Sequence, residues 1–440
     1  MRPEEDGMAA KSRFFMDPVH GFIVLSDELM LQLVDTAEFQ RLRRIRQLGA
    51  SFGTYHGAEH TRFGHSLGAL HLLERALASL AQQGVRLAPD EARLLRAAVL
   101  LHDVGHGPFS HALEGLITPG LSHERWGAAI ITWPGSQVHQ VLAAWDPQLP
   151  HQVASLLLGQ DAALPPWARA LLSSQLDVDR MDYLLRDAHF TGSRYGLFDL
   201  DQLIRLLQVQ DGELVIGPDG REAVEEYVLG RFFMYRRVYL HRTTRGHELL
   251  LHQAWRRARE LAAAGRGEPS RLAFWLAWEP GREPDAEAIR AYLNLDDSDL
   301  WYALKGWRAD PDPILADLAG RFLDRRLLKP LFREPVPHLP AGFLEAASER
   351  VRQSGWDPAH YLVVDRVQSI AYDPYGPQPG RAPITVAGPE GPVELSQLST
   401  LVAAAAELAR PAFQVYVPAE VRPELQALMR DLGEAEGQRG

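Results

Sequence analysis

The chain contains 440 residues with a net charge of -11, and its composition excludes several classes of protein. Hydrophobic residues make up 46% and charged residues 23%, which is typical of a globular protein with two or three domains. Residues 1–10 are acidic and lack the apolar segment of a secretory signal, and no apolar run could span a bilayer. We therefore expect a cytoplasmic protein without a membrane partner.

The absence of cysteine limits the chemistry of any metal site. Disulfides, zinc–thiolate sites and iron–sulfur clusters are excluded, so histidine nitrogens and carboxylate oxygens must hold any metal. The sequence contains 17 histidines, which is enough for such a site. The excess of acidic residues argues against nucleic acid as a partner, because phosphates repel an acidic surface.

The first part of the chain, residues 1–265, is predicted to be mainly helical. Apolar residues recur every three or four positions in segments such as 70–80 and 94–101, which is the period of an amphipathic helix. A small β-hairpin is predicted at 213–223, where a short apolar strand precedes the turn-forming residues 217–220. The hairpin is an insertion between helices.

The rest of the chain divides into two further parts. Residues 266–340 are predicted to be helical, with interruptions at prolines, and residues 341–440 are predicted to form an α+β region. The predicted elements of this region are strands at 361–367, 384–386 and 413–417, a turn at 374–383 and a closing helix at 418–432. The whole chain is therefore predicted to be mainly α.

Four side chains of the helical part combine metal-binding chemistry with inward-facing positions. His65 lies on the apolar face of its helix, His102 and Asp103 continue the apolar stripes of the preceding helix, and Asp179 lies in a later helix. Burial of an isolated imidazole or carboxylate is costly, and one divalent cation would offset this cost for all four groups. This set suits Mn²⁺, Fe²⁺ or Mg²⁺, with Zn²⁺ as a further candidate.

A histidine-rich turn follows the second of these helices, with the sequence HDVGHGPFSH at 102–111. Its two glycines allow a tight backbone path, which brings further histidines close to the predicted metal. A lone inward histidine is more often a hydrogen-bonded core residue, but several together indicate a function. The candidates for acid–base catalysis are His106, His111, His123 and Glu124.

The order of these motifs resembles that of the HD-domain deoxynucleoside triphosphate triphosphohydrolases, a family that includes bacterial dGTPase-like enzymes. The resemblance covers about residues 17–247, and it implies that the fold is an HD-domain helical bundle. The matching segments are 17–21 (DPVHG), 39–43 (FQRLR), 47–49 (QLG), 61–68 (TRFGHSLG), 102–111 and 177–183 (DVDRMDY).

The resemblance also implies roles for individual residues. The family's metal ligands correspond to His65, His102, Asp103 and Asp179. Its deoxynucleotide (dNTP) site places Arg62 and Arg180 on phosphates, Tyr183 in the same helix as Arg180, and Tyr239 under the deoxyribose. The remaining substrate contacts correspond to Gln47, Leu48 and Asp187 around the sugar, and to Arg231, His241 and Arg242 near further phosphate or base positions.

The mechanism that these residues suggest is metal-assisted hydrolysis at the α-phosphorus. Water would attack the α-phosphorus, the deoxynucleoside would leave through its 5′-oxygen, and triphosphate would be released intact. His111 or His106 would protonate the leaving oxygen, with His123 and Glu124 as a supporting dyad.

Regulation is also implied by the resemblance, because some relatives are tetramers activated by a guanine nucleotide at a subunit interface. The matching positions are Asp35, Gln40 and Arg43, and we expect a homo-oligomer, either a dimer or a tetramer. Arg13 and Met16 stand where a human member of the same family has Lys and Asn, so this site is altered.

Two alternatives remain open from the sequence. The first is an HD phosphohydrolase of another substrate, such as a nucleoside monophosphate, (p)ppGpp or a cyclic nucleotide. The second is a nucleotide sensor or single-stranded nucleic-acid-binding protein without catalysis. The resemblance places Gln47, Asp187 and Tyr239 around a deoxyribose, which favours a dNTP substrate over the substrates of the first alternative. The complete ligand set and the acidic composition argue against the second.

Overall fold

The computed structural model describes residues 12–160, 163–266, 271–367, 372, 382–408 and 411–437, with side chains described as far as residue 432. The acidic N-terminal residues 1–10 and most of the predicted turn at 374–383 lie outside the described residues. In the described part, no helix is both long and apolar enough to cross a membrane.

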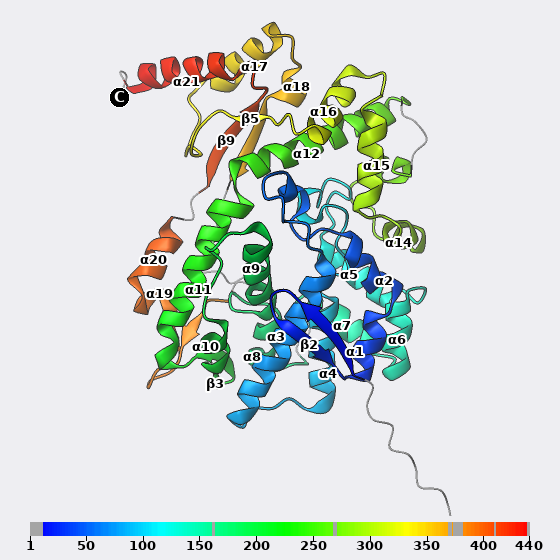
Figure 1. The fold of residues 1–440 in the computed structure, drawn as a ribbon, viewed down its shortest axis with the longest axis vertical. Coiled ribbons are helices and arrows are strands. Elements are labelled where there is room, and N and C mark those ends of the chain that lie inside the picture. The colour runs from blue at the N-terminus through cyan, green and yellow to red at the C-terminus, as the bar shows by residue number, and fades with distance from the viewer. Residues whose placement is uncertain are drawn as a thin grey trace, which may run out of the picture.

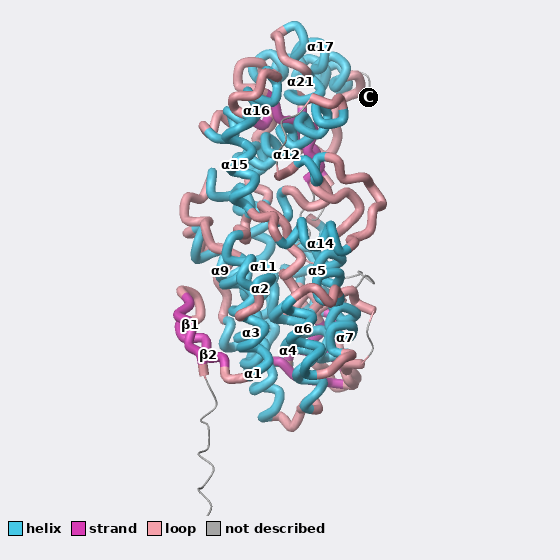
Figure 2. The backbone as a smooth tube through the Cα atoms, turned by 90° about the vertical axis from the view of Figure 1, so that its right-hand side faces the viewer, coloured by secondary structure: helices cyan, strands magenta, loops and turns pink. Residues whose placement is uncertain are grey.

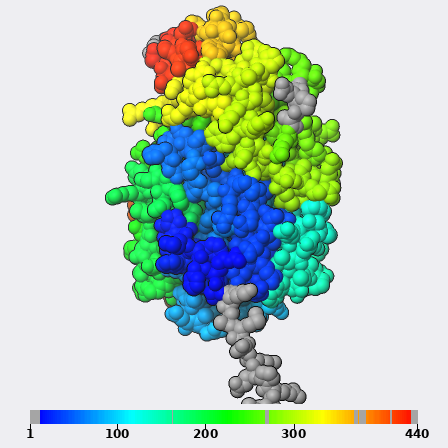
Figure 3. Space-filling view, turned by 45° about the vertical axis from the view of Figure 1, so that its right-hand side comes forward, coloured from blue at the N-terminus to red at the C-terminus, as the bar shows by residue number. Residues whose placement is uncertain are grey.

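The described chain begins with an antiparallel hairpin that the sequence analysis did not predict, formed by β1 (Arg13–Asp17) and β2 (Gly21–Leu25). Alternate side chains of β2 point inward, where Ile23 and Leu25 are buried. The outward side chains are apolar as well and remain exposed: Phe14, Met16, Phe22 and Val24. The hairpin lies at the surface of the molecule, as Figures 2 and 3 show.

A bundle of helices forms the body of the molecule (Figure 1). Its central pair is α3 (Arg62–Gln82) and α9 (Val178–Thr191), which pack against each other, and α3 also packs against α4 (Pro89–Leu101). The surrounding helices are α1 (Glu28–Val34), α2 (Ala37–Arg41), α5 (His123–Thr132), α6 (Gln137–Trp145), α7 (Leu149–Leu157), α8 (Pro166–Leu172), α10 (Leu200–Arg205) and α11 (Arg221–Met234).

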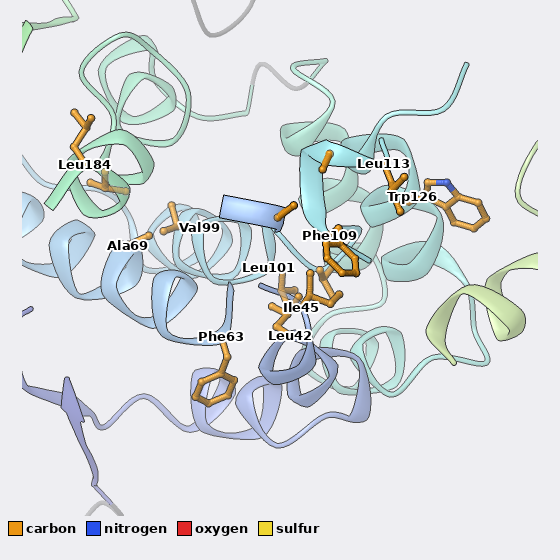
Figure 4. Packing of buried hydrophobic residues seen from close by; sticks show 14 of the residues in the cluster. Leu42, Ile45, Phe63, Ala69, Val99, Leu101, Phe109, Leu113, Trp126 and Leu184 are labelled. Atoms are coloured by element: carbon orange, nitrogen blue, oxygen red, sulfur yellow. The ribbon is translucent and has the colours of Figure 1, made fainter. Parts of the chain in front are cut away.

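The core of this bundle follows from the apolar stripes of its helices. The stripes of α3 and α4 are fully buried, including Leu73 and Leu101. Figure 4 shows this cluster around Leu101 and Phe109, with Leu42 and Ile45 among the side chains that point into it. The same stripes carry His65 and His102, so packing of the helices places both imidazoles inside.

The inserted hairpin is present but begins earlier than the sequence analysis predicted. It consists of β3 (Leu207–Gln210) and β4 (Glu213–Ile216), and its turn is Asp211-Gly212. Both turn residues have positive φ, 54° and 82°, which suits the tight turn of a two-residue hairpin loop. Residues 217–220, predicted as the turn, instead include a short 3₁₀ helix that leads into α11.

The longest helix, among the described residues, connects the body of the molecule to its C-terminal elements. This helix, α12 (Arg242–Ala263), follows a one-turn π-helix, Tyr235–Tyr239, that continues α11. The predicted helices of 266–340 are present as α13 (Ala273–Leu276), α14 (Ala286–Leu293), α15 (Asp297–Trp307) and α16 (Pro313–Leu323).

The C-terminal elements form two small sheets. β6 (Val363–Val367) and β5 (Lys329–Pro330) flank β9 (Ala412–Val417), while β7 (Thr385–Val386) extends the inserted hairpin and pairs with β8 (Val393–Glu394). The helices of this region are α17 (Phe343–Gln353), α18 (Pro358–Tyr361), α19 (Leu395–Leu398), α20 (Thr400–Glu407) and α21 (Arg422–Gly437).

The mainly α fold with an inserted hairpin and a C-terminal α+β region is confirmed. In Figure 1, α12 lies between the bundle and the β5–β9–β6 sheet and packs against α16 and β5, and α20 lies beside α11. One buried apolar cluster extends from Ile23 to Leu425. The division at 265 and 340 stays a prediction, since strands from different parts pair within the β3–β4–β7–β8 sheet and within the β5–β9–β6 sheet.

Candidate active site

The four predicted metal ligands converge inside the bundle. His65 Nε2 lies 3.2 Å from His102 Nε2, 3.6 Å from Asp103 Oδ2 and 3.0 Å from Asp179 Oδ1. His102 Nε2 lies 3.4 Å from Asp103 Oδ1. Atoms bound about 2.1 Å from one ion are roughly 3 to 3.4 Å apart, so the spacing of His65, His102 and Asp103 suits a single divalent cation. Asp179, the fourth predicted ligand, places Oδ1 3.7 Å from His102 Nε2.

Neighbouring groups orient both imidazoles toward this centre. The Nδ1 atom of His65 lies 2.7 Å from Asp182, and the Nδ1 atom of His102 lies 2.7 Å from the carbonyl oxygen of Val99. Protons on the two Nδ1 atoms satisfy these acceptors and leave the Nε2 lone pairs free for a metal. The donor set and its surroundings therefore fit a cation held by two imidazoles and two carboxylates.

The Asp182 carboxylate is itself fixed by two further residues. Arg186 donates to it from the next turn of α9 at 2.8 Å and 3.0 Å, and His20 contacts it at 2.6 Å from the loop after β1. A Cβ at Gly68 would lie 1.9 Å from Asp182 Oδ1. Glycine at this position of α3 is therefore a condition for the carboxylate to reach His65.

The electrostatics of the cluster favour positive charge at its centre. Burial lowers the pKa of His65, but Asp179, Asp182 and Asp103 outweigh it and raise this pKa to about 10. Burial alone would raise the pKa of Asp103, yet Arg62 and the neighbouring histidines hold it well below its usual range. The carboxylates are thus ionised at neutral pH, as cation binding requires.

The predicted acid–base residues form a second cluster next to the first. The rings of His106 and His123 stack with centroids 3.8 Å apart, and His106 Nε2 lies 3.3 Å from Asp103. The Glu124 carboxylate is 3.3 Å from His123 Nε2. His111 is more exposed, with 65% of its side chain accessible, and faces the adjoining pocket.

Glu114 joins this second cluster, and the sequence analysis missed it. Its carboxylate lies 2.6 Å from His111 Nδ1 and 2.7 Å from His123 Nδ1. Burial raises the pKa of Glu114, but the hydrogen bonds from both histidines hold it well below its usual range. Its position three residues after His111 is the only signal in the sequence that could have indicated it.

The turn that carries these histidines has an unusual backbone. Its glycines permit close packing, because a Cβ at Gly105 would lie 2.1 Å from the His123 carbonyl oxygen. The left-handed residues are instead Phe109 and Ser110, with φ of 55° and 52°. Hydrogen bonds hold the turn: Phe109 N–H donates to Asp297 at 2.8 Å, and the Ser110 hydroxyl accepts from Arg62 at 2.6 Å.

A pocket of about 300 Å³ is lined by His111 of the second cluster and by Arg62, which contacts Asp103 of the first. Its wall includes seven of the predicted residues: Gln47, Leu48, Arg62, His111, Tyr183, Asp187 and Tyr239. It also includes seven that the sequence analysis did not identify: Gly49, Ser51, Phe109, Ala112, Tyr235, Arg245 and Glu248. Tyr235 and Tyr239 come from the π-helix, a distortion that often occurs at functional sites.

Several contacts order the wall of this pocket. Arg62 donates to Asp103 at 2.6 Å, so one side chain joins the pocket to the four predicted metal ligands, which we call the metal cluster. The Tyr239 hydroxyl donates to Asp187 at 2.8 Å, and His60 contacts the same carboxylate at 2.8 Å. The Gln47 side-chain oxygen is buried without a hydrogen-bond partner among the described residues, so it can accept a bond from a ligand.

In the described part of the chain, four of the residues predicted to contact the substrate do not line this pocket. Arg180 forms an ion pair with Asp177, and buried Arg231 lies over the Tyr235 ring at 5.6 Å. His241 caps the start of α12, where its ring accepts from Thr243 N–H. Arg242 is directed away, toward the Arg333 carbonyl oxygen at 3.2 Å.

The three predicted effector residues lie at the surface beside the N-terminal hairpin. Asp35 accepts a bidentate ion pair from Arg13 of β1, at 2.6 Å and 2.8 Å. Gln40 accepts from Arg43, whose guanidinium also lies over the Phe63 ring at 3.5 Å. Asp35 thus contacts the hairpin, while Gln40 and Arg43 contact each other.

Known proteins match this arrangement in sequence and structure. The HD domain matches residues 62–187, which include all four predicted ligands, and the HD-associated region matches residues 198–273. The uncharacterised protein YwfO of Bacillus subtilis is 35% identical over 97% of this chain and 98% of its own length. The chain belongs to the HD-domain phosphohydrolases.

Other relatives extend the comparison of this HD-domain phosphohydrolase. A solved phosphohydrolase from Bacteroides thetaiotaomicron is 30% identical, covers 92% of this chain and 99% of its own, and has a TM-score of 0.79. The human deoxynucleoside triphosphate triphosphohydrolase SAMHD1 is 30% identical, but the match covers 51% of this chain and 41% of the human protein. Metal-dependent phosphohydrolysis is thus the chemistry of the family, whereas the substrate requires a separate argument.

Proposed function

We propose that this protein hydrolyses deoxynucleoside triphosphates to deoxynucleosides and inorganic triphosphate. The observation that carries the proposal is Arg62, which lines the pocket and donates to Asp103 in the metal cluster. A ligand in this pocket therefore has its phosphates next to both a guanidinium and the converging ligands. The name of the human relative supports a dNTP as that ligand.

The residues of the chain provide the other requirements of this reaction. A cation held by His65, His102, Asp103 and Asp179 would polarise the α-phosphate, with Mn²⁺, Mg²⁺ or Fe²⁺ as candidates and Zn²⁺ as a further one. Arg62 neutralises developing charge on the phosphoryl oxygens. Tyr239, bonded to Asp187, forms the surface on which the deoxyribose would lie.

Among the histidines, His111 is the better donor to the leaving 5′-oxygen. It faces the pocket, and the Glu114 carboxylate, 2.6 Å from its Nδ1, holds the ring in place. Burial, together with Arg62 and His123, holds the pKa of His106 well below its usual range, so His106 is neutral at pH 7. We assign His106, His123 and Glu124 to supporting roles around Asp103 and Glu114.

The test is product analysis with purified protein reconstituted with each metal. The four dNTPs are incubated singly and as a mixture, with the ribonucleotides as controls, and the phosphate products are resolved. Deoxynucleoside with intact triphosphate is the expected result. Release of pyrophosphate or orthophosphate would contradict attack at the α-phosphorus, and absence of turnover with every metal would redirect the search to another phosphate ester.

The same assay tests the proposed regulation and assembly. Turnover that appears only in the mixture or with a guanine nucleotide would support an effector site at Asp35, Gln40 and Arg43. Size-exclusion chromatography with and without nucleotide would show whether a dimer or tetramer accompanies it. A monomer with full activity on single dNTPs would overturn both parts of this proposal.

A further inference from the structure

Two charged residues of the pocket wall have no role in the reaction proposed above. Arg245 and Glu248 lie one turn apart on α12, and both line the pocket together with Arg62 and Tyr239. Arg62 joins this pocket to the metal cluster, whereas Arg245 is joined to the C-terminal sheet. This pair therefore brings a second set of charges to the pocket, and these charges are linked to the C-terminal sheet.

The geometry of Arg245 is fixed by a carboxylate from that sheet. Its Nε donates to Asp365 Oδ2 at 3.0 Å and its Nη2 to Asp365 Oδ1 at 2.8 Å, a bidentate pair. Its Nη1 donates to Glu248 Oε2 at 2.6 Å. Asp365 is buried in β6, where it pairs in register with Gln414 of β9, so the position of Arg245 depends on the sheet.

The charge of this wall determines which part of a nucleotide suits it. Asp365 already neutralises Arg245, and Glu248 adds no positive charge, so the pair offers no net attraction for a triphosphate. The triphosphate is better placed beside Arg62 and the metal cluster. The part of the nucleotide that suits Arg245 and Glu248 is therefore the nucleobase, an uncharged group with hydrogen-bonding edges.

The free hydrogen-bonding atoms of the pair are complementary to one kind of base. Glu248 Oε1 has no partner among the described residues and can accept, while Arg245 retains N–H groups that can donate. Guanine combines the O6 acceptor with neighbouring N1–H and N2–H donors, which a carboxylate beside a guanidinium can bind together. Adenine and cytosine have a single amino donor on this edge, and thymine has a single imino donor.

We propose that Arg245 and Glu248, positioned by Asp365, recognise the nucleobase and favour guanine. This inference rests on the proposed function, because it assigns the base of the same deoxynucleotide. It also gives the C-terminal sheet a role: β6 supplies the carboxylate that positions the recognition pair. Asp365 is a positioning residue and does not contact the substrate.

The first experiment compares kcat/KM for the four dNTPs in the wild type and in Glu248→Gln. We expect dGTP to be the best wild-type substrate and the variant to lose about tenfold for dGTP relative to the other three, as for one charged hydrogen bond. The matched control is Glu260→Gln, the same change on the same helix outside the described pocket wall, which should keep the wild-type profile. An unchanged profile in Glu248→Gln, or a wild-type preference for a pyrimidine, overturns the proposal.

The second experiment tests Asp365 and separates this inference from the proposed reaction. Asp365→Asn should raise KM for dGTP with little change in kcat or metal content, and Asp365→Glu should restore part of the selectivity; a fall in kcat alone would contradict positioning.

Binding of the four deoxynucleosides is measured by calorimetry in parallel. Guanine-selective binding that Glu248→Gln abolishes would sustain the inference even if no dNTP is hydrolysed, whereas hydrolysis with equal binding of all four would refute the inference and leave the reaction standing.

Discussion

At the scale of single residues, Asp103 connects the parts of the site. Its carboxylate approaches His65 and His102, accepts from Arg62 and lies 3.3 Å from His106. In the proposed reaction, one side chain would therefore contribute to metal binding, to the orientation of a phosphate-binding arginine and to the histidine cluster. Its loss should affect all three at once.

We expect Asp103→Ala and His102→Ala to abolish turnover and bound metal while the fold persists. Each removes one predicted ligand from the buried cluster between the helices and leaves the apolar core of the bundle in place. Activity assays, elemental analysis and circular dichroism measure the three properties, with the exposed His151→Ala as a control. Turnover retained by either variant would remove the metal assignment.

A second residue-scale prediction concerns His20, which contacts no predicted ligand directly. It lies 2.6 Å from Asp182, the carboxylate that orients His65. Loss of such an outer partner typically weakens metal affinity 10–100-fold. We expect this range for His20→Ala in a chelator-competition titration, and an affinity equal to the wild type would show that Arg186 alone suffices to hold Asp182.

At the scale of elements, the approach of α3 to α9 depends on a glycine. A Cβ at Gly68 would meet Asp182 Oδ1 at 1.9 Å and Arg186 Nη2 at 2.5 Å, both in a buried network. Gly68→Ala should therefore lower the melting temperature and weaken metal binding. Gly306→Ala on α15, where a Cβ meets nothing within 4 Å, should be neutral or stabilising by up to about 1 kcal/mol. Equal effects of the two changes in thermal unfolding would contradict this account.

The elements that the sequence predicted well are those with a strong local pattern. The apolar stripes of α3 and α4 indicate helices without any tertiary information, and they also predict that His65 and His102 face inward. The inserted hairpin was predicted too late in the chain because residues 217–220 carry turn chemistry too, although Asp211-Gly212 forms the actual turn. The β1–β2 hairpin was missed because its apolar residues lie on both faces.

The parts of the site that the sequence did not predict depend on contacts distant in the chain. Glu114 becomes significant only because the fold places it between His111 and His123. Arg245 and Glu248 resemble ordinary charges on an amphipathic helix until the pocket and Asp365 are known. Arg180 and Arg242 illustrate the opposite case, since sequence motifs do not reveal that Asp177 and a backbone carbonyl engage them.

At the scale of the whole molecule, buried neutral histidines make stability depend on pH. Burial lowers the pKa of both His247 and His252 to about 4. The unfolded chain binds these protons near pH 6.5, so it holds more protons than the folded chain between about pH 6.5 and 4. Stability from these groups is complete above pH 6.5 and is lost as the pH falls toward 4, by up to about 1.4 kcal/mol per pH unit for each proton.

Urea unfolding across this range, with chelator present, should show this loss. The His247→Gln variant removes one titrating group, so its free energy of unfolding should fall less steeply with acid than that of the wild type. The comparison of slopes is independent of any overall destabilisation by the substitution. Parallel slopes for the two proteins would mean that His247 binds its proton equally in both states.

The backbone at Phe109 and Ser110 affects whether enzymatic activity or helical structure is lost first on heating. Two adjacent left-handed residues cost about 1–3 kcal/mol each, so the turn keeps this shape only while its surroundings restrain it. One restraint is Asp297 at the start of α15, nearly 200 residues further along the chain. Loosening of α15 would let the turn relax, and His111 would move away from the pocket. Enzymatic activity should therefore decay at a lower temperature than helicity, and coincident decay of the two signals would show that the turn yields only with the whole fold.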